Sequence, residues 1–188
     1  NIVLARRQSG KSIAVVAYLL WYVIFKGEQV VGVLANKNAI AREMLSRITL
    51  MLENLPFFLQ PGCTTLNKGS IGFSNNSRII AAATSSSSIR GMSLNLVYLD
   101  EFAFVENATE FYTSTYPVIS SGKTSKIIIT STANGIGNMY HKLYEGAIQG
   151  TNEFKSTRVD WWDVPGRDEK WKAMTIENTS QLQFDQEF

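Results

Sequence analysis

Short apolar runs of strand length alternate with longer apolar or amphipathic stretches along most of this chain. Asn1–Ala5 and Gln29–Ala35 are expected to be buried strands, and the run Ile13–Phe25 between them is expected to be a helix. Strands that alternate with helices are typical of an α/β fold with a mainly parallel central sheet flanked by helices. Further strands are expected at Leu96–Leu99 and Lys126–Thr130, and a further helix near Gly137–Ile148.

A second amphipathic helix is expected after the strand that ends at Ala35. Asn36 is expected to cap this helix and Pro56 to end it. Further along, Ile71–Ser74 and Arg78–Ala83 flank an Asn-Asn pair and indicate a small hairpin. The apolar residues of this helix form one stripe, which we interpret as core packing: Ile40, Met44, Ile48 and Leu52. We also interpret the later tryptophans as packing residues: Trp161, Trp162 and Trp171.

The composition fits one α/β domain. The chain has 188 residues, 45% of them apolar, which is enough for a sizeable core. One cysteine, Cys63, excludes a disulfide framework and fits a reducing cytoplasm, and with one histidine, His141, there is no zinc site. The net charge of +2 indicates no basic field for nucleic acid, so a DNA contact would be local or outside this chain.

The segment after the first expected strand has the residues of a phosphate-binding loop. Residues 5–12 read Ala-Arg-Arg-Gln-Ser-Gly-Lys-Ser, and the predicted helix follows directly. Gly10 lets the backbone approach a phosphate, Lys11 offers a positive charge to the β- and γ-oxygens, and the Ser12 hydroxyl can ligate Mg²⁺. The usual first glycine is replaced by Ala5, which fits only if its φ stays negative. Strand, loop and helix is the order that the motif requires, so we predict a nucleotide site.

Two adjacent carboxylates follow the predicted strand Leu96–Leu99. Asp100 can hold the same Mg²⁺ through water, and Glu101 can polarise the attacking water. An alternative is that the carboxylates stabilise the N-terminus of a following helix through its dipole. Two carboxylates this close together are costly unless a cation neutralises them, which favours a catalytic role for Glu101.

These motifs resemble those of the large terminase subunit of tailed bacteriophages, in its N-terminal ATPase domain and in the large-headed myovirus group. That family's phosphate loop also lacks the first glycine and has an arginine before Gln-x-Gly-Lys-Ser/Thr, as in Arg7–Ser12. Its acidic strand is similar to Val97–Phe104. Its coupling motif, Thr-Thr-Thr-Pro-Asn-Gly, is similar to Thr130–Gly135, where Ala133 replaces the proline. Other similar segments are Arg90–Ser93, Pro117–Gly122 and Gln181–Glu187, the last near the family's boundary with a nuclease domain.

The resemblance implies a P-loop NTPase of the ASCE type that hydrolyses ATP with Mg²⁺ as cofactor. In that family the corresponding residues would have defined roles. Glu101 would orient the attacking water, and Arg7 would act in cis as an arginine finger on the γ-phosphate. Ser12 and Asp100 would hold the Mg²⁺, while Ser131, Thr132 and Asn134 would sense the γ-phosphate and couple its loss to movement. The nucleotide would be bound by Arg6, Arg7, Gln8, Ser9, Gly10, Lys11 and Ser12.

The resemblance also implies a biological setting. The motor would package double-stranded DNA into a procapsid in the host cell cytoplasm, as a homo-oligomeric ring docked on the portal protein and assisted by the small terminase subunit. The chain lacks an initiating Met and stops without a turn signal, so we expect residues 1–188 to be one ATPase domain of a longer protein. The nuclease's acidic metal cluster has no counterpart in this sequence.

Two alternatives remain open at this stage. A RecA-like lobe of a DNA helicase or translocase shares the Gly-Lys loop and the Asp-Glu pair, but it would need a second lobe that supplies an arginine. A scaffold that binds ATP without turnover is the non-enzyme alternative, and the intact Lys11, Asp100 and Glu101 argue against it.

Overall fold

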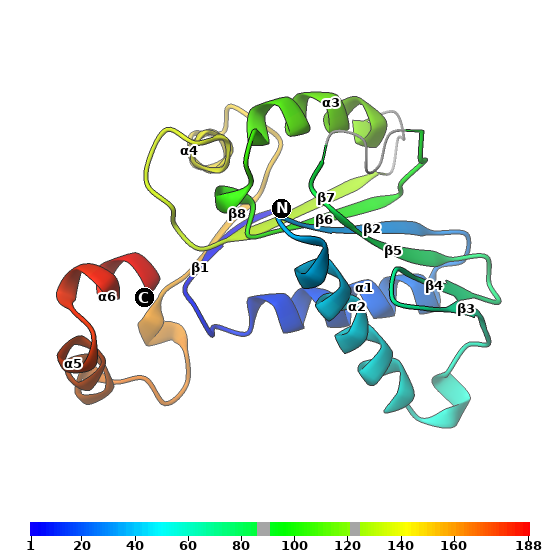
Figure 1. Ribbon diagram of the computed structural model, residues 1–188, viewed down its shortest axis with the longest axis horizontal. Helices are drawn as coiled ribbons and strands as arrows, with labels where there is room; N and C mark the ends of the chain where they lie inside the picture. Colours follow the sequence, from blue (N-terminus) through cyan, green and yellow to red (C-terminus); the bar gives the residue numbers. More distant parts are fainter. Residues whose placement is uncertain (86–90, 121–124) are drawn as a thin grey trace.

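The computed structural model describes residues 1–85, 91–120 and 125–188, and its centre is one mixed β-sheet (Figure 1). The strand order in the sheet is β3-β4-β5-β2-β6-β7-β1-β8. Every neighbouring pair from β5 to β8 in this order is parallel, and only the β3–β4 and β4–β5 pairs are antiparallel. The strands are β1 (Ile2–Ala5), β2 (Val30–Ala35), β3 (Cys63–Leu66), β4 (Ser70–Phe73), β5 (Arg78–Ala83), β6 (Leu96–Asp100), β7 (Lys126–Ser131) and β8 (Ser156–Val159).

Helices cover both faces of this sheet. Figure 1 shows α1 (Lys11–Phe25) and α2 (Asn38–Glu53) on one face, and α3 (Ala108–Ser120) and α4 (Met139–Gln149) on the other. Two short helices, α5 (Glu169–Asn178) and α6 (Gln181–Glu187), lie beyond the end of β1. Single 3₁₀ turns occur at Phe57–Leu59, Phe102–Phe104 and Trp161–Asp163. None of these helices is both long and apolar enough to span a bilayer.

The two helical layers explain why the central strands are apolar throughout. In β6, Leu96 and Tyr98 pack into the core beneath α1 and α2, whereas Val97 and Leu99 pack into the core beneath α3 and α4. A strand buried on both faces has no solvent side, so its sequence is a continuous apolar run. The same alternation directs Tyr98 and Asp100 toward one face of the sheet, the face that α1 covers.

Most of the predicted elements are present, and the predicted fold class is confirmed. The predicted strands and helices differ from the observed ones only at their ends, and the predicted hairpin is formed by β4 and β5. Of the tryptophans, Trp161 is buried against Trp171 and Phe184, as expected for packing, while Trp162 is exposed and contacts Trp161 edge-on. β3, α3, β8, α5 and α6 were not anticipated from the sequence pattern.

One local prediction was wrong. Asn36 does not cap α2: that helix begins at Asn38, and its N-cap residue is Lys37, which makes no side-chain capping bond. The chain needs two more residues to turn from β2 into the helix, so Asn36 stays at the end of the strand. The polar stretch Thr84–Ser88 and the segments around Arg90 and Gly122 lie partly outside the described residues.

Candidate nucleotide site

The carboxyl ends of the parallel strands form one edge of the sheet, and the predicted site residues follow those ends. β1 leads into the phosphate loop, β6 ends at Asp100, and β7 ends at Ser131. Because parallel strands share their direction, segments far apart in the sequence meet there. A cavity of about 490 Å³ lies at this edge. It is lined by Arg7, Gln8, Ser9, Gly10, Lys11, Ser12, Ile13, Asn36, Ile40, Arg47, Glu101 and Phe104.

The backbone of the phosphate loop explains why Ala5 is tolerated. Ala5 is the buried last residue of β1 and has a negative φ, as the substitution requires. The left-handed positions fall later in the loop, at Gln8 (φ 55°) and Gly10 (φ 80°). Gly10 is the N-cap residue of α1, where a residue with a Cβ would be strained by its φ although nothing crowds the position. The loop therefore turns directly into a helix whose free N–H groups suit a phosphate.

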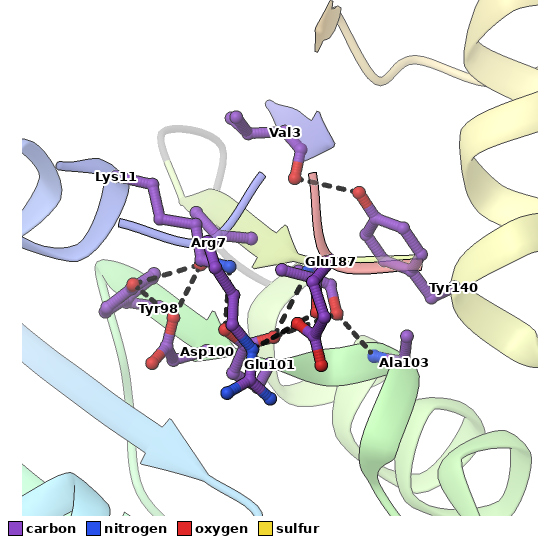
Figure 2. A network of polar contacts seen from close by, with 12 residues as sticks. Val3, Arg7, Lys11, Tyr98, Asp100, Glu101, Ala103, Tyr140 and Glu187 are labelled. Carbon is purple, nitrogen blue, oxygen red and sulfur yellow. Dashed lines mark hydrogen bonds and ion pairs between the residues drawn. The ribbon is translucent and has the colours of Figure 1, made fainter. Parts of the chain in front are cut away.

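Lys11 and Glu101 both line this cavity and form an ion pair there (Figure 2). The Lys11 Nζ lies 2.6 Å from Glu101 Oε1, and the Lys11 side chain is only 9% exposed. Glu101 itself has a left-handed φ of 49°, which is uncommon for a residue with a side chain. This conformation turns Glu101 out of the strand direction at the point where Asp100 ends β6. The predicted phosphate-binding lysine and the predicted base are thus in direct contact.

Asp100 is held inside the fold by two hydroxyl groups. The Tyr98 hydroxyl and the Thr130 Oγ1 each donate to Asp100 Oδ1, both at 2.7 Å. Burial raises the pKa of Asp100 above its usual value, although these hydrogen bonds and the charge of Lys11 favour the ionised form. The pKa of Tyr98 is raised as well, first by burial and then by the Asp100 charge. A buried carboxylate that is costly to ionise is one that a bound cation would stabilise.

The donors at this position fit Mg²⁺. Mg²⁺ prefers oxygen ligands and is usually bound by one or two protein groups together with phosphates and water. Asp100 supplies a carboxylate, and the Ser12 side chain, in the first turn of α1, lies near the Tyr98 hydroxyl that holds Asp100. Within residues 1–85, 91–120 and 125–188, no three His, Cys, Asp or Glu side chains gather into a metal cluster. A carboxylate and a hydroxyl are oxygen donors of the kind that hold Mg²⁺ together with phosphates and water.

The predicted coupling residues contact Glu101 and the turn that follows it. The Thr132 backbone N–H donates to Glu101 Oε2 at 3.1 Å, and the Ser131 and Thr132 hydroxyls lie 3.4 Å from the same oxygen. Asn134 donates to the carbonyl oxygen of Ala103 at 2.9 Å. Glu101 is therefore bound on one oxygen by Lys11 and on the other by the end of β7.

The arginines of the phosphate loop are engaged by the C-terminal part of the chain. Arg7 lines the cavity, and its guanidinium forms an ion pair with Glu187 of α6 (Figure 2). Arg6 is not part of the cavity lining: it points to Asp160 and to the carbonyl oxygen of Asp185. Arg167 donates to the carbonyl oxygens of Arg7 and Gln8, at 3.0 and 3.3 Å.

Sequence reasoning missed three residues at or beside this cavity. Asn36 and Arg47 line it, and Tyr98 holds Asp100 from within the core. Asn36 could have been found, because it follows β2 in the way that Asp100 completes β6, and Ala35 pairs with Asp100 in the sheet. Arg47 could not, because it looks like an ordinary exposed residue of an amphipathic helix, where it pairs with Glu43.

Comparisons with known proteins identify the family and the fold of this chain. The family model for the terminase large subunit of T4-like viruses, N-terminal part, matches residues 2–188. Among solved structures, the large terminase ATPase domain of Thermus phage P74-26 is 20% identical with a TM-score of 0.79, covering 100% of this chain and 86% of that one.

Two longer structures show the same fold. The large terminase of bacteriophage HK97 is 19% identical with a TM-score of 0.78, over 98% of this chain and 44% of that one. The large terminase of a thermophilic bacteriophage, solved in complex with ADP, is 14% identical with a TM-score of 0.77, over 100% of this chain and 46% of that one. This chain thus spans less than half of these two terminases.

The strand order agrees with the predicted class of NTPase, and the family match bears on the helicase alternative. The strand that carries the acidic pair is separated from the phosphate-loop strand by β7, as expected for an ASCE-type P-loop NTPase. The family match covers nearly the whole chain, so it favours a terminase over a helicase lobe. The chain therefore belongs to the terminase large-subunit family of T4-like viruses, whose members package viral DNA, and it comprises the family's N-terminal domain.

Proposed function

We propose that this domain hydrolyses ATP to ADP and phosphate and that it powers the packaging of double-stranded viral DNA. The observation that carries the proposal is the contact of Lys11 with Glu101 in a cavity that the phosphate loop lines, with Asp100 buried directly before Glu101. The lysine of the phosphate loop and the two carboxylates at the end of β6 thus lie together, which supports their roles as phosphate-binding cation, metal-binding carboxylate and base. This role accounts for two adjacent carboxylates at this edge of the sheet.

The resident groups have distinct tasks in this reaction. The backbone N–H groups at Gly10 and the Lys11 ammonium hold the phosphates, and Arg6, Gln8 and Ser9 shape the loop around them. Ser12 and Asp100 would hold Mg²⁺, which neutralises charge on the phosphate oxygens when it is bound. Glu101 is released from Lys11 when phosphate oxygens become the lysine's partners, and its freed carboxylate then orients the attacking water. Substrate binding thereby produces the active form of the base.

Arg7 completes the site as a cis arginine finger on the γ-phosphate. It lines the cavity from the loop itself, and its side chain is 59% exposed, so a rotation toward the phosphates meets little obstruction. This rotation breaks the ion pair with Glu187, and the more negatively charged γ-phosphate becomes the new partner of Arg7. Such a finger contributes roughly 10³–10⁵ in rate.

Ser131, Thr132 and Asn134 transmit the state of the site. They contact Glu101 and the Ala103 carbonyl from the end of β7, so a movement of Glu101 changes their hydrogen bonds. Since the 3₁₀ turn Phe102–Phe104 follows Glu101, loss of the γ-phosphate would be passed to that turn and the helix after it.

The same proposal extends to the whole protein. Residues 1–188 act as one ATPase domain, with a nuclease domain downstream in the longer chain. The partners are double-stranded DNA, the portal protein of the procapsid and the small terminase subunit, and packaging takes place in the host cell cytoplasm with the large subunit as a homo-oligomeric ring. Family membership and the shared fold support these assignments.

The test is a pair of substitutions in the site. Lys11→Ala is expected to abolish ATP binding, because it removes the cation that contacts the phosphates in the ground state. Glu101→Gln is expected to bind ATP as tightly as the parent or up to ~5-fold more tightly, since Lys11 loses its competing partner. Its turnover should fall by about 10²–10⁴-fold, the usual contribution of a general base.

Binding is measured by fluorescence with a labelled ATP analogue, and turnover by phosphate release, with Glu53→Gln at the exposed end of α2 as the matched control. Near-normal hydrolysis by Glu101→Gln would exclude Glu101 as the base. Absence of phosphate release from the parent chain, both alone and within the full-length protein with procapsids, would instead support an ATP-binding scaffold.

A further inference from the structure

The metal side of the site contains a hydrogen-bond network that no motif predicted. Its three members are Tyr98 and Asp100 of β6 and Thr130 of β7, and all three are at most 3% exposed. The Tyr98 hydroxyl and the Thr130 Oγ1 both reach Asp100 Oδ1 at 2.7 Å, and they lie 3.0 Å from each other. The three oxygens thus form a closed triangle inside the core, and Figure 2 shows Tyr98 beside Asp100.

The sheet register explains how this triangle is built. Asp100 and Thr130 are direct neighbours in the parallel pairing of β6 with β7, and Tyr98 lies two positions before Asp100 on the same face. Both hydrogen bonds described here end on Oδ1. They therefore restrict the orientation of the carboxylate and leave Oδ2 outside these two hydrogen bonds.

The network also reaches the second metal-binding candidate. The Ser12 side chain lies near the Tyr98 hydroxyl, so the phosphate-loop hydroxyl and the acidic strand approach each other at this tyrosine. A phenylalanine would fill the same volume in an apolar core. A hydroxyl placed there must satisfy its own hydrogen bonds, and it does so on the groups expected to hold the cation.

We propose that Tyr98 and Thr130 are positioning residues for Mg²⁺, because their hydroxyls orient the Asp100 carboxylate. This inference rests on the proposed ATPase function and adds the residues that determine metal affinity. Groups that orient a metal ligand by hydrogen bonds typically change metal affinity by about 10–100-fold when they are removed. Neighbouring positions of β7 then serve neighbouring carboxylates, with Thr130 on Asp100 and Ser131 and Thr132 on Glu101.

The test measures how much Mg²⁺ tightens nucleotide binding, so it does not depend on turnover. Binding of a fluorescent ADP analogue to the chain is titrated in EDTA and again in MgCl₂, for the parent and for Tyr98→Phe, Thr130→Val and Thr130→Ser. Tyr98→Phe and Thr130→Val are expected to keep the affinity in EDTA and to raise the half-saturating Mg²⁺ concentration by about 10-fold or more. Thr130→Ser keeps the hydroxyl and should behave like the parent.

The matched control is Tyr140→Phe. Tyr140 is also a buried tyrosine with a bonded hydroxyl, which donates to the Val3 carbonyl oxygen, and its substitution should leave the Mg²⁺ dependence unchanged. Thermal melting of each variant identifies any that are unfolded. If Tyr98→Phe is unfolded, the comparison of Thr130→Val with Thr130→Ser tests the inference, because these two side chains are close in shape and differ in the hydroxyl.

The outcomes separate the inference from the proposed function. Unchanged Mg²⁺ dependence in folded Tyr98→Phe and Thr130→Val would overturn the inference, and so would equal losses in EDTA and in MgCl₂, which indicate a purely structural role. If Lys11→Ala binds the analogue as well as the parent does, the nucleotide site itself is wrong and the inference falls with it.

Discussion

The two sides of the nucleotide site are held in different ways. On the metal side, Asp100 is buried and is fixed by hydroxyls of its own strand and of the adjacent strand. On the phosphate-loop side, Arg7 is largely exposed and is held by Glu187, which lies 180 residues further along the chain. The first arrangement follows from sheet register and is rigid, whereas the second depends on how the C-terminal helices dock. We infer that the metal side keeps its geometry through the cycle and that the arginine side changes.

The C-terminal helices dock through aromatic packing rather than through the sheet. Trp161, Trp171, Phe184 and Phe188 contact one another with ring centroids 5.2–6.1 Å apart. Arg167 stacks on this group, 4.6 Å from the centroid of Trp171, and it also holds the backbone of the phosphate loop. One side chain thus links the aromatic cluster with the loop that carries Arg7.

The largest effect that would test this comparison is expected from Arg7→Lys. Lysine keeps the charge but loses the planar fork that contacts two oxygens at once, so ATP should bind almost normally while turnover falls by about 10³-fold. The partner variant Glu187→Gln frees Arg7 without changing it and should keep or increase turnover. Phosphate release is measured for both, in this chain and in the full-length protein with procapsids. Equal packaging-coupled hydrolysis by Arg7→Lys and the parent would mean that another subunit supplies the arginine.

A smaller effect is expected from Arg167→Ala. This change removes the stacking on Trp171 and two hydrogen bonds to the loop, so the free energy of unfolding should fall by about 1–2 kcal/mol. ATP affinity should fall several-fold, because the loop loses its support, while the half-saturating Mg²⁺ concentration stays unchanged. Arg42→Ala, at an exposed position of α2 outside the cavity lining, is the control for the loss of a positive charge. A change in Mg²⁺ dependence would show that the two sides of the site are not independent.

The smallest effect is expected from Asn36→Ala. Asn36 lines the cavity next to the end of β6, and its Oδ1 is buried without a hydrogen-bond partner within the part of the chain that the structure describes. It is placed to contact the nucleotide or the attacking water, so kcat/KM should fall by roughly 3–10-fold, which corresponds to about 1 kcal/mol of hydrogen bonding. Asn38→Ala, in the first turn of α2, is the control. Identical kinetics of the two variants would assign Asn36 to the fold alone.

Sequence and structure contributed different parts of this picture. The sequence by itself determined the parallel α/β architecture, the phosphate loop and the acidic pair, because each is encoded in a contiguous segment: an apolar strand followed by Gly10-Lys11-Ser12 or by Asp100-Glu101. Strand burial and loop chemistry are local properties, so a local pattern was sufficient to predict them.

Only the tertiary structure decided which of these groups touch. The pair of Lys11 with Glu101, the triangle of Tyr98, Asp100 and Thr130, and the hold of Glu187 on Arg7 each join segments that are distant in sequence. Such contacts depend on the order and register of the strands. The sequence of β6 does not predict that β7 pairs with it in this register. For the same reason Tyr98 looked like one more apolar core position, and Asn36 like a helix cap, until the folded sheet placed both beside the site.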